Sequence, residues 1–274
     1  MGSVAILFAQ LRTVCVHQLR LFFIALQFFT RLPIPRWVGF EPDWLQHGAR
    51  YFALVGVVVG AITSAVYACA SWLWPQTVAV LLSTIAGIYL TGAFHEDGFA
   101  DVCDGFGGAA APERVLEIMR DSRIGAYGAI GIALMLGLKC AALVYLPAQA
   151  AISALLMAHP LSRLASTFLI WCLAYVRAEG KAKPLAQSIS TAELGIATGT
   201  ALAPIFVLGL AGWLSWYAIV AGLTAAALAT LWLKKLFLRR IGGYTGDCLG
   251  ALQQVAEVAC YLAVLACTRA GILQ

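Results

Sequence analysis

Between an apolar run and a glycine-rich turn, the chain reads His95-Glu96-Asp97-Gly98-Phe99-Ala100-Asp101-Val102-Cys103-Asp104-Gly105-Phe106-Gly107-Gly108. This stretch places four carboxylates within nine residues, in a protein with 13 acidic residues in all. Asp101 follows Asp97 by four residues and Asp104 follows by three more, so a helix would carry all three on one face. Like charges so arranged repel one another unless a cation neutralises them, and Mg²⁺ prefers oxygen ligands and commonly meets substrate phosphates. The stretch therefore predicts a divalent-metal site suited to phosphate chemistry.

The rest of the chain has the composition of a membrane protein. Of its 274 residues, 62% are apolar and 11% are charged, and the mean hydropathy is +0.87, whereas soluble domains carry roughly 25% charged residues. A helix needs about 20 apolar residues to cross the hydrocarbon core. Seven segments approach that length: 51–74, 77–94, 124–146, 149–175, 194–214, 216–233 and 248–267.

These apolar runs are continuous rather than alternating, which excludes a transmembrane β-barrel. They also leave no room for a separate soluble domain. We therefore predict an all-α, polytopic integral membrane bundle of about seven transmembrane helices, forming one membrane-embedded catalytic domain over residues 1–274.

Basic residues predict the orientation of this bundle. Alternate connections are either very short or long and polar, so seven spans place residues 1–50 and every long connection on the same side. That side would hold Arg12, Arg20, Arg31, Arg36, Arg50, Arg114, Arg120, Arg123, Arg177, Lys181, Lys183, Lys234, Lys235, Arg239 and Arg240, against Arg269 on the other. Under the positive-inside rule the polar side is cytoplasmic. The net charge of +5 is explained by this asymmetry, and no nucleic-acid partner is expected.

The first 50 residues form an interfacial region in this interpretation. Polar residues recur at helical spacing from Gln10 to Arg31 and the other faces are rich in Leu and Phe, which indicates an amphipathic helix in the cytoplasmic membrane interface. A short or re-entrant span around residues 19–30 is the alternative. Pro33 and Pro35 then end any helix.

Residues 95–123 are expected to form an acidic cytoplasmic catalytic loop. Asp97, Asp101 and Asp104 are its candidate catalytic and metal-binding residues, and a solvated acidic loop without function is the alternative. Gly105 is among the glycines whose backbone would approach a phosphate closely. The same side of the membrane would hold the other chemical groups of the chain, whereas a transporter more typically gathers them near the midplane.

Two further motifs supply candidates on the same side. In Arg120-Asp121-Ser122-Arg123, Asp121 could complete a metal shell, while the two arginines could bind a diphosphate through forked hydrogen bonds. In Gly242-Gly243-Tyr244-Thr245-Gly246-Asp247, a glycine-rich turn carries Asp247 into the start of a span. Either motif could instead be an ordinary helix cap.

Charged residues inside the spans are costly there and mark functional sites by default. Lys139, Arg163 and Glu257 are such residues. A structural ion pair in the bundle interior and a substrate contact are equal alternatives for them, with Glu257 able to pair with either cation. His95 could hydrogen-bond the substrate or a metal-bound carboxylate, or lie at the interface as a plain polar residue.

At these residues the chain resembles the adenosylcobalamin synthase family, the adenosylcobinamide-GDP ribazoletransferases also called cobalamin-5′-phosphate synthases. The resemblance rests on His95-x-Asp97-Gly98-x-x-Asp101-x-x-Asp104-Gly105, on Leu116 to Gly125, and on Gly243-x-Thr245-Gly246-Asp247-x-Leu249-Gly250, with Thr30 to Pro35 near the N-terminus. It runs in order from about residue 25 to residue 265.

The resemblance implies a reaction and roles for these residues. The family joins adenosylcobinamide-GDP to α-ribazole, or to α-ribazole 5′-phosphate, and releases GMP, so these substrates and membrane lipid are the expected partners. Mg²⁺, or Mn²⁺ in its place, is the expected cofactor. The expected roles are catalysis by His95, Asp97, Asp101 and Asp104, substrate binding by Gly105, Arg120, Arg123, Lys139 and Arg163, and metal binding by Asp97, Asp101, Asp104, Asp121 and Asp247. The sequence leaves the oligomeric state open, a homo-oligomer included.

Two other functions are alternatives to this transfer reaction. A CDP-alcohol phosphotransferase of lipid synthesis also uses D-x-x-D-G beside a membrane, but it then needs a later aspartate pair that this chain lacks. A metal or corrinoid transporter would require Lys139, Arg163 and Glu257 to line a continuous path.

Overall fold

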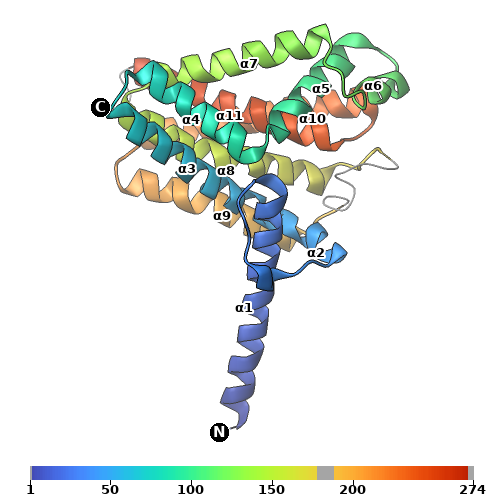
Figure 1. The fold of residues 1–274 in the computed structure, drawn as a ribbon, viewed down its shortest axis with the longest axis vertical. Coiled ribbons are helices and arrows are strands. Elements are labelled where there is room, and N and C mark those ends of the chain that lie inside the picture. The colour runs from blue at the N-terminus through green and yellow to red at the C-terminus, as the bar shows by residue number, and fades with distance from the viewer. Residues whose placement is uncertain (1, 178–187, 271–274) are drawn as a thin grey trace.

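The chain is an all-helical bundle from which one long helix extends (Figure 1). The computed structural model describes residues 2–177 and 188–270; Lys181 and Lys183, counted above among the cytoplasmic basic residues, lie outside them. The described residues contain no β-strand beyond a single bridge between Tyr175 and Tyr244. The α-helices are α1 (Gly2–Phe29), α2 (Pro42–His47), α3 (Phe52–Ser71), α4 (Gln76–Thr91), α5 (Phe94–Gly108), α6 (Pro112–Ile118), α7 (Ala126–Val144), α8 (Ala148–Cys172), α9 (Thr191–Leu210), α10 (Trp216–Ile241) and α11 (Gly246–Arg269).

Each of the seven expected spans corresponds to a helix, which confirms the polytopic bundle. Within the described residues, six helices are long and apolar enough to cross a membrane: the one that includes α3, and α7 to α11. The seventh span corresponds to α4, which has 16 residues and is followed by α5 after a bend of 88°. The count reaches seven if this bent pair is taken as one span.

Two residues make that bend. Gly92 and Ala93 both adopt the left-handed conformation, with φ values of 64° and 59°. Glycine takes this conformation readily, but a side chain pays a steric cost for it. Ala93 is the one described non-glycine residue with a positive φ. The sharp turn redirects the chain so that α5 packs against α7 and α11.

The expected acidic connection at residues 95–123 is largely helical, as the spacing of its aspartates required. Residues 94–108 form α5 and residues 112–118 form α6, and only the stretches around them are irregular. The segment is helical because one side of it is buried: Gly98, Val102 and Gly105 share a helical face and are covered by neighbouring parts of the chain.

The short connections lie at one end of the bundle and the long polar ones at the other, as the alternation of connection lengths predicts. The short connections lie together, since the Gln76 side chain donates to Leu146 O (2.6 Å) and the Gln149 side chain donates to Trp213 O (3.4 Å). At the opposite end, α5 packs against α6, α7 and α11. The acidic and glycine-rich motifs therefore share one end, although its placement in the cytoplasm stays a prediction.

The N-terminal segment is one helix, as expected. Helix α1 runs crosswise to the bundle helices and extends beyond them (Figure 1). From Leu21 onward it buries Ile24, Ala25 and Phe29 against the protein, whereas Arg12 to Cys15 are exposed. It is not among the helices that meet the length and hydropathy criteria for a span. Its position in the membrane interface stays a prediction.

Helices α3 and α8 pack closest at Gly56. A methyl group on Gly56 would stand 2.5 Å from His159 O and 2.6 Å from Pro160 Cα, both backbone atoms of α8. Overpacking of this kind costs about 1–3 kcal/mol because the backbones must separate. Gly137 of α7 offers a control, since nothing lies within 4 Å of a methyl group there.

We predict that Gly56→Ala lowers the thermal unfolding midpoint of the purified protein by several degrees, on the order of 2–4 °C for each kcal/mol lost. Gly137→Ala should leave the midpoint unchanged or raise it slightly, because alanine favours helix. Equal midpoints for the two variants in the same detergent would contradict the close contact between α3 and α8.

Candidate active site

The outer side of α5 carries the three aspartates predicted to lie together. Asp97 is exposed, and Asp101 and Asp104 are partly exposed. Asp101 lies within electrostatic range of Asp97, Asp104 and Asp247. Among the described residues no donor hydrogen-bonds to the carboxylate of Asp97 or Asp101, so both keep their oxygens available.

Asp104 is held differently, because its carboxylate accepts two backbone hydrogen bonds. Gly125 N donates to Oδ2 (2.7 Å) and Gly128 N donates to Oδ1 (2.8 Å). These N–H groups open α7, where the first turn of a helix leaves its donors unsatisfied. Asp104 thus caps α7 from another helix and fixes the Asp121–Gly125 segment against α5.

Gly105 faces the protein rather than an open surface. A methyl group there would lie 2.5 Å from Met119 Cγ and 3.1 Å from Val115 O. The residue allows α6 to pack on α5, and its backbone is buried.

Asp247 reaches the acidic face of α5 because two glycines let α11 approach that helix. A methyl group on Gly98 would lie 2.9 Å from Asp247 Cα, and one on Gly250 would lie 3.1 Å from His95 O. Thr245 caps α11, as its hydroxyl accepts from Cys248 N (3.4 Å). Asp247 therefore enters the site from the first turn of α11, in accordance with the expected convergence.

Arg177 forms an ion pair with Asp247, and sequence reasoning had counted it only as an orientation charge. Its Nη2 lies 2.7 Å from Asp247 Oδ2, with the two side chains 11% and 20% exposed. The same nitrogen donates to Met119 O (3.3 Å). Nearby, burial raises the pKa of Tyr175. The signal in the sequence was weak: Arg177 follows the aromatic end of an apolar span like any interfacial cation.

Asp121 and Arg123 bind each other in an exposed turn. Arg123 Nη2 lies 2.7 Å from Asp121 Oδ2 and the Arg123 backbone N–H donates to Oδ1 (3.1 Å). These hydrogen bonds lower the pKa of Asp121 to about 2. The turn shares a surface depression with Asp104, and Arg120 is exposed beside it.

The five predicted metal ligands are therefore not assembled into one cluster. Across residues 2–177 and 188–270, no three His, Cys, Asp or Glu side chains gather so that they could hold a metal ion. Three of the five have other partners: Asp104 binds the α7 backbone, Asp121 binds Arg123 and Asp247 binds Arg177. Asp97 and Asp101 are left as free carboxylates on one helical face, which is the donor chemistry that Mg²⁺ prefers.

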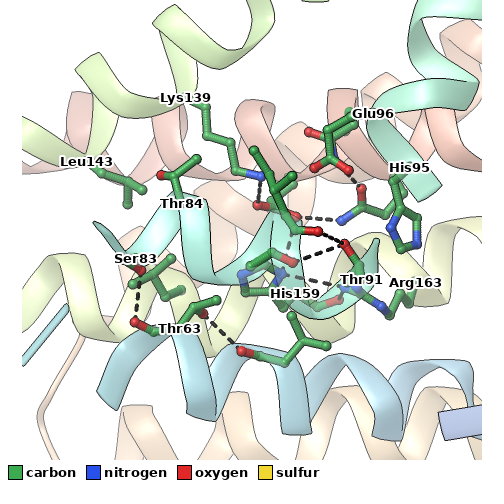
Figure 2. A pocket seen from close by; sticks show the side chains of 17 residues that line it. Thr63, Ser83, Thr84, Thr91, His95, Glu96, Lys139, Leu143, His159 and Arg163 are labelled. Carbon is green, nitrogen blue, oxygen red and sulfur yellow. Dashed lines mark hydrogen bonds and ion pairs between the residues drawn. The ribbon is translucent and has the colours of Figure 1, made fainter. Parts of the chain in front are cut away.

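The other side of α5 contributes to a polar cavity inside the bundle (Figure 2). At its centre Glu257 of α11 is fully buried and is the hub of an interaction network. Glu257 Oε1 lies 2.6 Å from Lys139 Nζ and accepts from Tyr261 OH (2.9 Å); Oε2 lies 3.3 Å from His159 Nδ1. The predicted interior pairing of Glu257 is confirmed, with Lys139 as its cation.

Further polar groups line the same cavity. Arg163 is 2% exposed and donates from Nη1 to His159 O (3.1 Å). Gln254 Nε2 donates to Glu96 Oε1 (2.9 Å). Within the described part of the chain, Arg163 Nε, Glu96 Oε2 and Gln254 Oε1 are buried without a hydrogen-bond partner. The cavity has about 20 Å³ of space for the centre of a water molecule, which is room for about one ordered water that would satisfy such a group.

His95 belongs to this interior and not to the acidic face. It is 4% exposed, stacks on Phe29 with ring centroids 5.7 Å apart, and has Arg163 and Glu257 among its charged neighbours. Sequence reasoning placed it with the aspartates because it is close to them in the chain. Asp97 follows His95 by two residues, which is about half a helical turn, so the side chains of His95 and Asp97 point to different sides of α5.

Sequence reasoning also missed Glu96, His159, Gln253 and Gln254. The adjacent glutamines 253 and 254 are a polar pair in an apolar span, which is a detectable signal because uncompensated polar groups are unfavourable in a membrane. Glu96 was hidden inside the acidic motif.

Comparison with known proteins assigns the family. The model of the cobalamin-5-phosphate synthase family matches residues 21–265. The adenosylcobinamide-GDP ribazoletransferase of Leptothrix cholodnii is 46% identical over 259 residues, covering 92% of this chain and 97% of that protein. Those of Shewanella frigidimarina and Shewanella woodyi are 46% and 44% identical and cover 92% and 91% of the chain and 96% of each relative.

No solved structure matches this chain significantly. The family match extends over the bundle, the acidic face of α5 and the glycine-rich entry to α11, which are the parts that carry the candidate site. The chain belongs to the cobalamin-5-phosphate synthase family.

Proposed function

We propose that this protein joins adenosylcobinamide-GDP to α-ribazole, or to α-ribazole 5′-phosphate, and releases GMP. The observation that carries the proposal is the acidic face of α5, with Asp97 and Asp101 free beside Asp247 at one end of a membrane bundle. The relatives named for this transfer support it, since they match almost the whole chain.

In the proposed reaction a ribose hydroxyl attacks the phosphorus on the cobinamide side of the diphosphate. A new P–O bond forms, the P–O bond to GMP breaks, and GMP leaves with the electron pair. Such transfers depend mainly on positioning and on neutralising charge. The protein must therefore hold two anionic groups in line and accept one proton.

Asp97 and Asp101 are the proposed ligands of Mg²⁺, or of Mn²⁺, with Asp247 as a third. When bound, the metal would neutralise charge on the diphosphate. Asp104 is proposed to act by positioning, because each of its oxygens accepts a backbone N–H of α7. The proton of the attacking hydroxyl goes to a carboxylate oxygen of this face, since His95 lies on the interior side of α5.

Arg120 and Arg123 are exposed next to this face and are proposed to attract the phosphates. The interior residues Lys139 and Arg163 are proposed to stabilise the bundle below α5 rather than to form a transport path. Lys139 is closely paired with Glu257 in a cavity, and both are buried.

The bias of basic residues towards the polar side supports an active site on the cytoplasmic face of the bacterial inner membrane. Substrates reach it from the cytoplasm, so the corrinoid need not cross the bilayer.

The function is tested by GMP release from adenosylcobinamide-GDP in purified membranes. We expect release only when α-ribazole or its phosphate and Mg²⁺ are both present, with one GMP for each corrinoid joined. Release without ribazole would indicate a hydrolase and contradict the proposal, as would corrinoid uptake into vesicles without any release of GMP.

We predict that Asp101→Asn lowers the turnover number by roughly two orders of magnitude or more, because one ligand of the charge-neutralising metal is lost. Glu117→Gln is the matched control, since this exposed carboxylate of α6 pairs only with exposed Arg114. Turnover of both variants is measured in membranes with equal amounts of inserted protein. Near-normal turnover of Asp101→Asn would refute its role.

Asp104 should respond differently to its two simplest replacements. An asparagine oxygen can still accept one N–H of α7, whereas alanine accepts none, and losing a cap costs about 1 kcal/mol. We therefore predict that Asp104→Ala lowers both thermal stability and turnover, and that Asp104→Asn retains more of each. If the two variants lose turnover equally with unchanged unfolding midpoints, Asp104 binds metal and is not a cap.

A further inference from the structure

Arg177 is held in the candidate site by the backbone that precedes it. Val176 N donates to Tyr244 O and Tyr244 N donates to Ala174 O, both at 3.0 Å. The two segments form the only β-bridge among the described residues. Gly243 makes it feasible, since a methyl group there would overlap Ala174 O. The chain leaving α8 is thereby fixed to the chain entering α11.

The guanidinium group of Arg177 lies in this rigid frame with hydrogen-bonding capacity to spare. Nη2 binds Asp247 Oδ2 and Met119 O, but Nε is buried and has no hydrogen-bond partner in the described part of the chain. A guanidinium has five N–H donors in a planar fork. A buried donor left unsatisfied is unfavourable, which indicates that a further acceptor belongs here.

The charges around the group show what that acceptor would be. Arg177 acts electrostatically on Asp101 as well as on Asp247, so it neutralises a site of like charges. A divalent cation would do the same. Once a cation occupies those carboxylates, the guanidinium is left with a planar fork that fits phosphate oxygens.

We propose that Arg177 is a substrate-binding residue that exchanges partners: it pairs with Asp247 in the free protein and with the diphosphate of the substrate once a divalent cation has bound. This inference rests on the proposed function. The proposal assigns to Arg177 the direct contact with the diphosphate that the sequence led us to expect of Arg123. The side chain of Arg123 is 87% exposed and forms an ion pair with Asp121.

Partner exchange predicts effects of opposite sign on two ligands. In Arg177→Gln the carboxylates lose their internal cation, so Mn²⁺ alone should bind about tenfold more tightly. Inorganic pyrophosphate, added with saturating Mn²⁺, should bind at least about tenfold more weakly because a charge-assisted fork is gone. Both affinities are measured on the full-length protein in detergent, with free Mn²⁺ followed by electron paramagnetic resonance. In the assay of GMP release, KM for the diphosphate substrate should rise more than kcat falls.

Two further variants control the experiment. Arg36→Gln removes one exposed positive charge outside the surface depression beside Asp104, and it should change neither affinity. Arg177→Lys keeps the charge without the fork, so Mn²⁺ affinity should stay near that of the unaltered protein while pyrophosphate binding weakens. This variant decides the matter if Arg177→Gln does not fold.

A purely structural Arg177 would give a different pattern. Weakened binding of both ligands, or unchanged binding of both, overturns the partner exchange. Neither titration requires turnover, so these outcomes are distinct from failure of the proposed function, which is absence of GMP release by the unaltered protein.

Discussion

The close approach of α5 to α11 organises the functional end of this protein. Gly98 and Gly250 remove the side chains that would hold the two helices apart, and the backbone of α5 then meets α11 at Asp247. Because α5 packs against α7 and α11 after the bend at Gly92 and Ala93, its two sides face different surroundings. One side presents Asp97 and Asp101 to solvent, and the other presents His95 and Glu96 to the interior.

The interior side explains how such an acidic helix can lie on a membrane bundle. Buried charges are tolerated only when they are paired and hydrogen-bonded. Glu257 forms an ion pair with Lys139 and accepts hydrogen bonds from Tyr261 and Gln253. Glu96 accepts a hydrogen bond from Gln254. These contacts join α5, α7 and α11 below the acidic face, so the same network that compensates the buried charges also fixes the helix that carries the aspartates. Replacing one member would leave others unpaired, which is more costly than losing the pair as a whole.

Much of the fold follows from local sequence, and much of the site does not. Seven apolar segments predicted the helices correctly because hydropathy depends only on composition, and the spacing of Asp97, Asp101 and Asp104 predicted their common face because helical geometry is fixed. The partners of Asp104 and Asp247 could not be predicted in this way. Gly125 N and Arg177 reach them from distant parts of the chain, and a carboxylate that caps a helix has the same sequence signature as one that binds a metal. His95 shows the converse error, since proximity in sequence suggested a shared site that the helix turn excludes.

The arrangement also explains why the acidic face can be stable before any substrate arrives. Three carboxylates lie near Asp101 in a region shielded from water on one side, where like charges repel one another, yet two of the three are compensated within the protein. Asp104 is satisfied by the first turn of α7 and Asp247 by Arg177, which leaves Asp97, the most exposed of them, and Asp101. An N–H cap is permanent because it is part of the α7 backbone, whereas a guanidinium on a side chain can leave when a stronger cation takes its place. Under the proposed function, the two kinds of compensation divide the aspartates by role: Asp104, paired with backbone, holds the structure, and Asp247, paired with a side chain, remains available for chemistry.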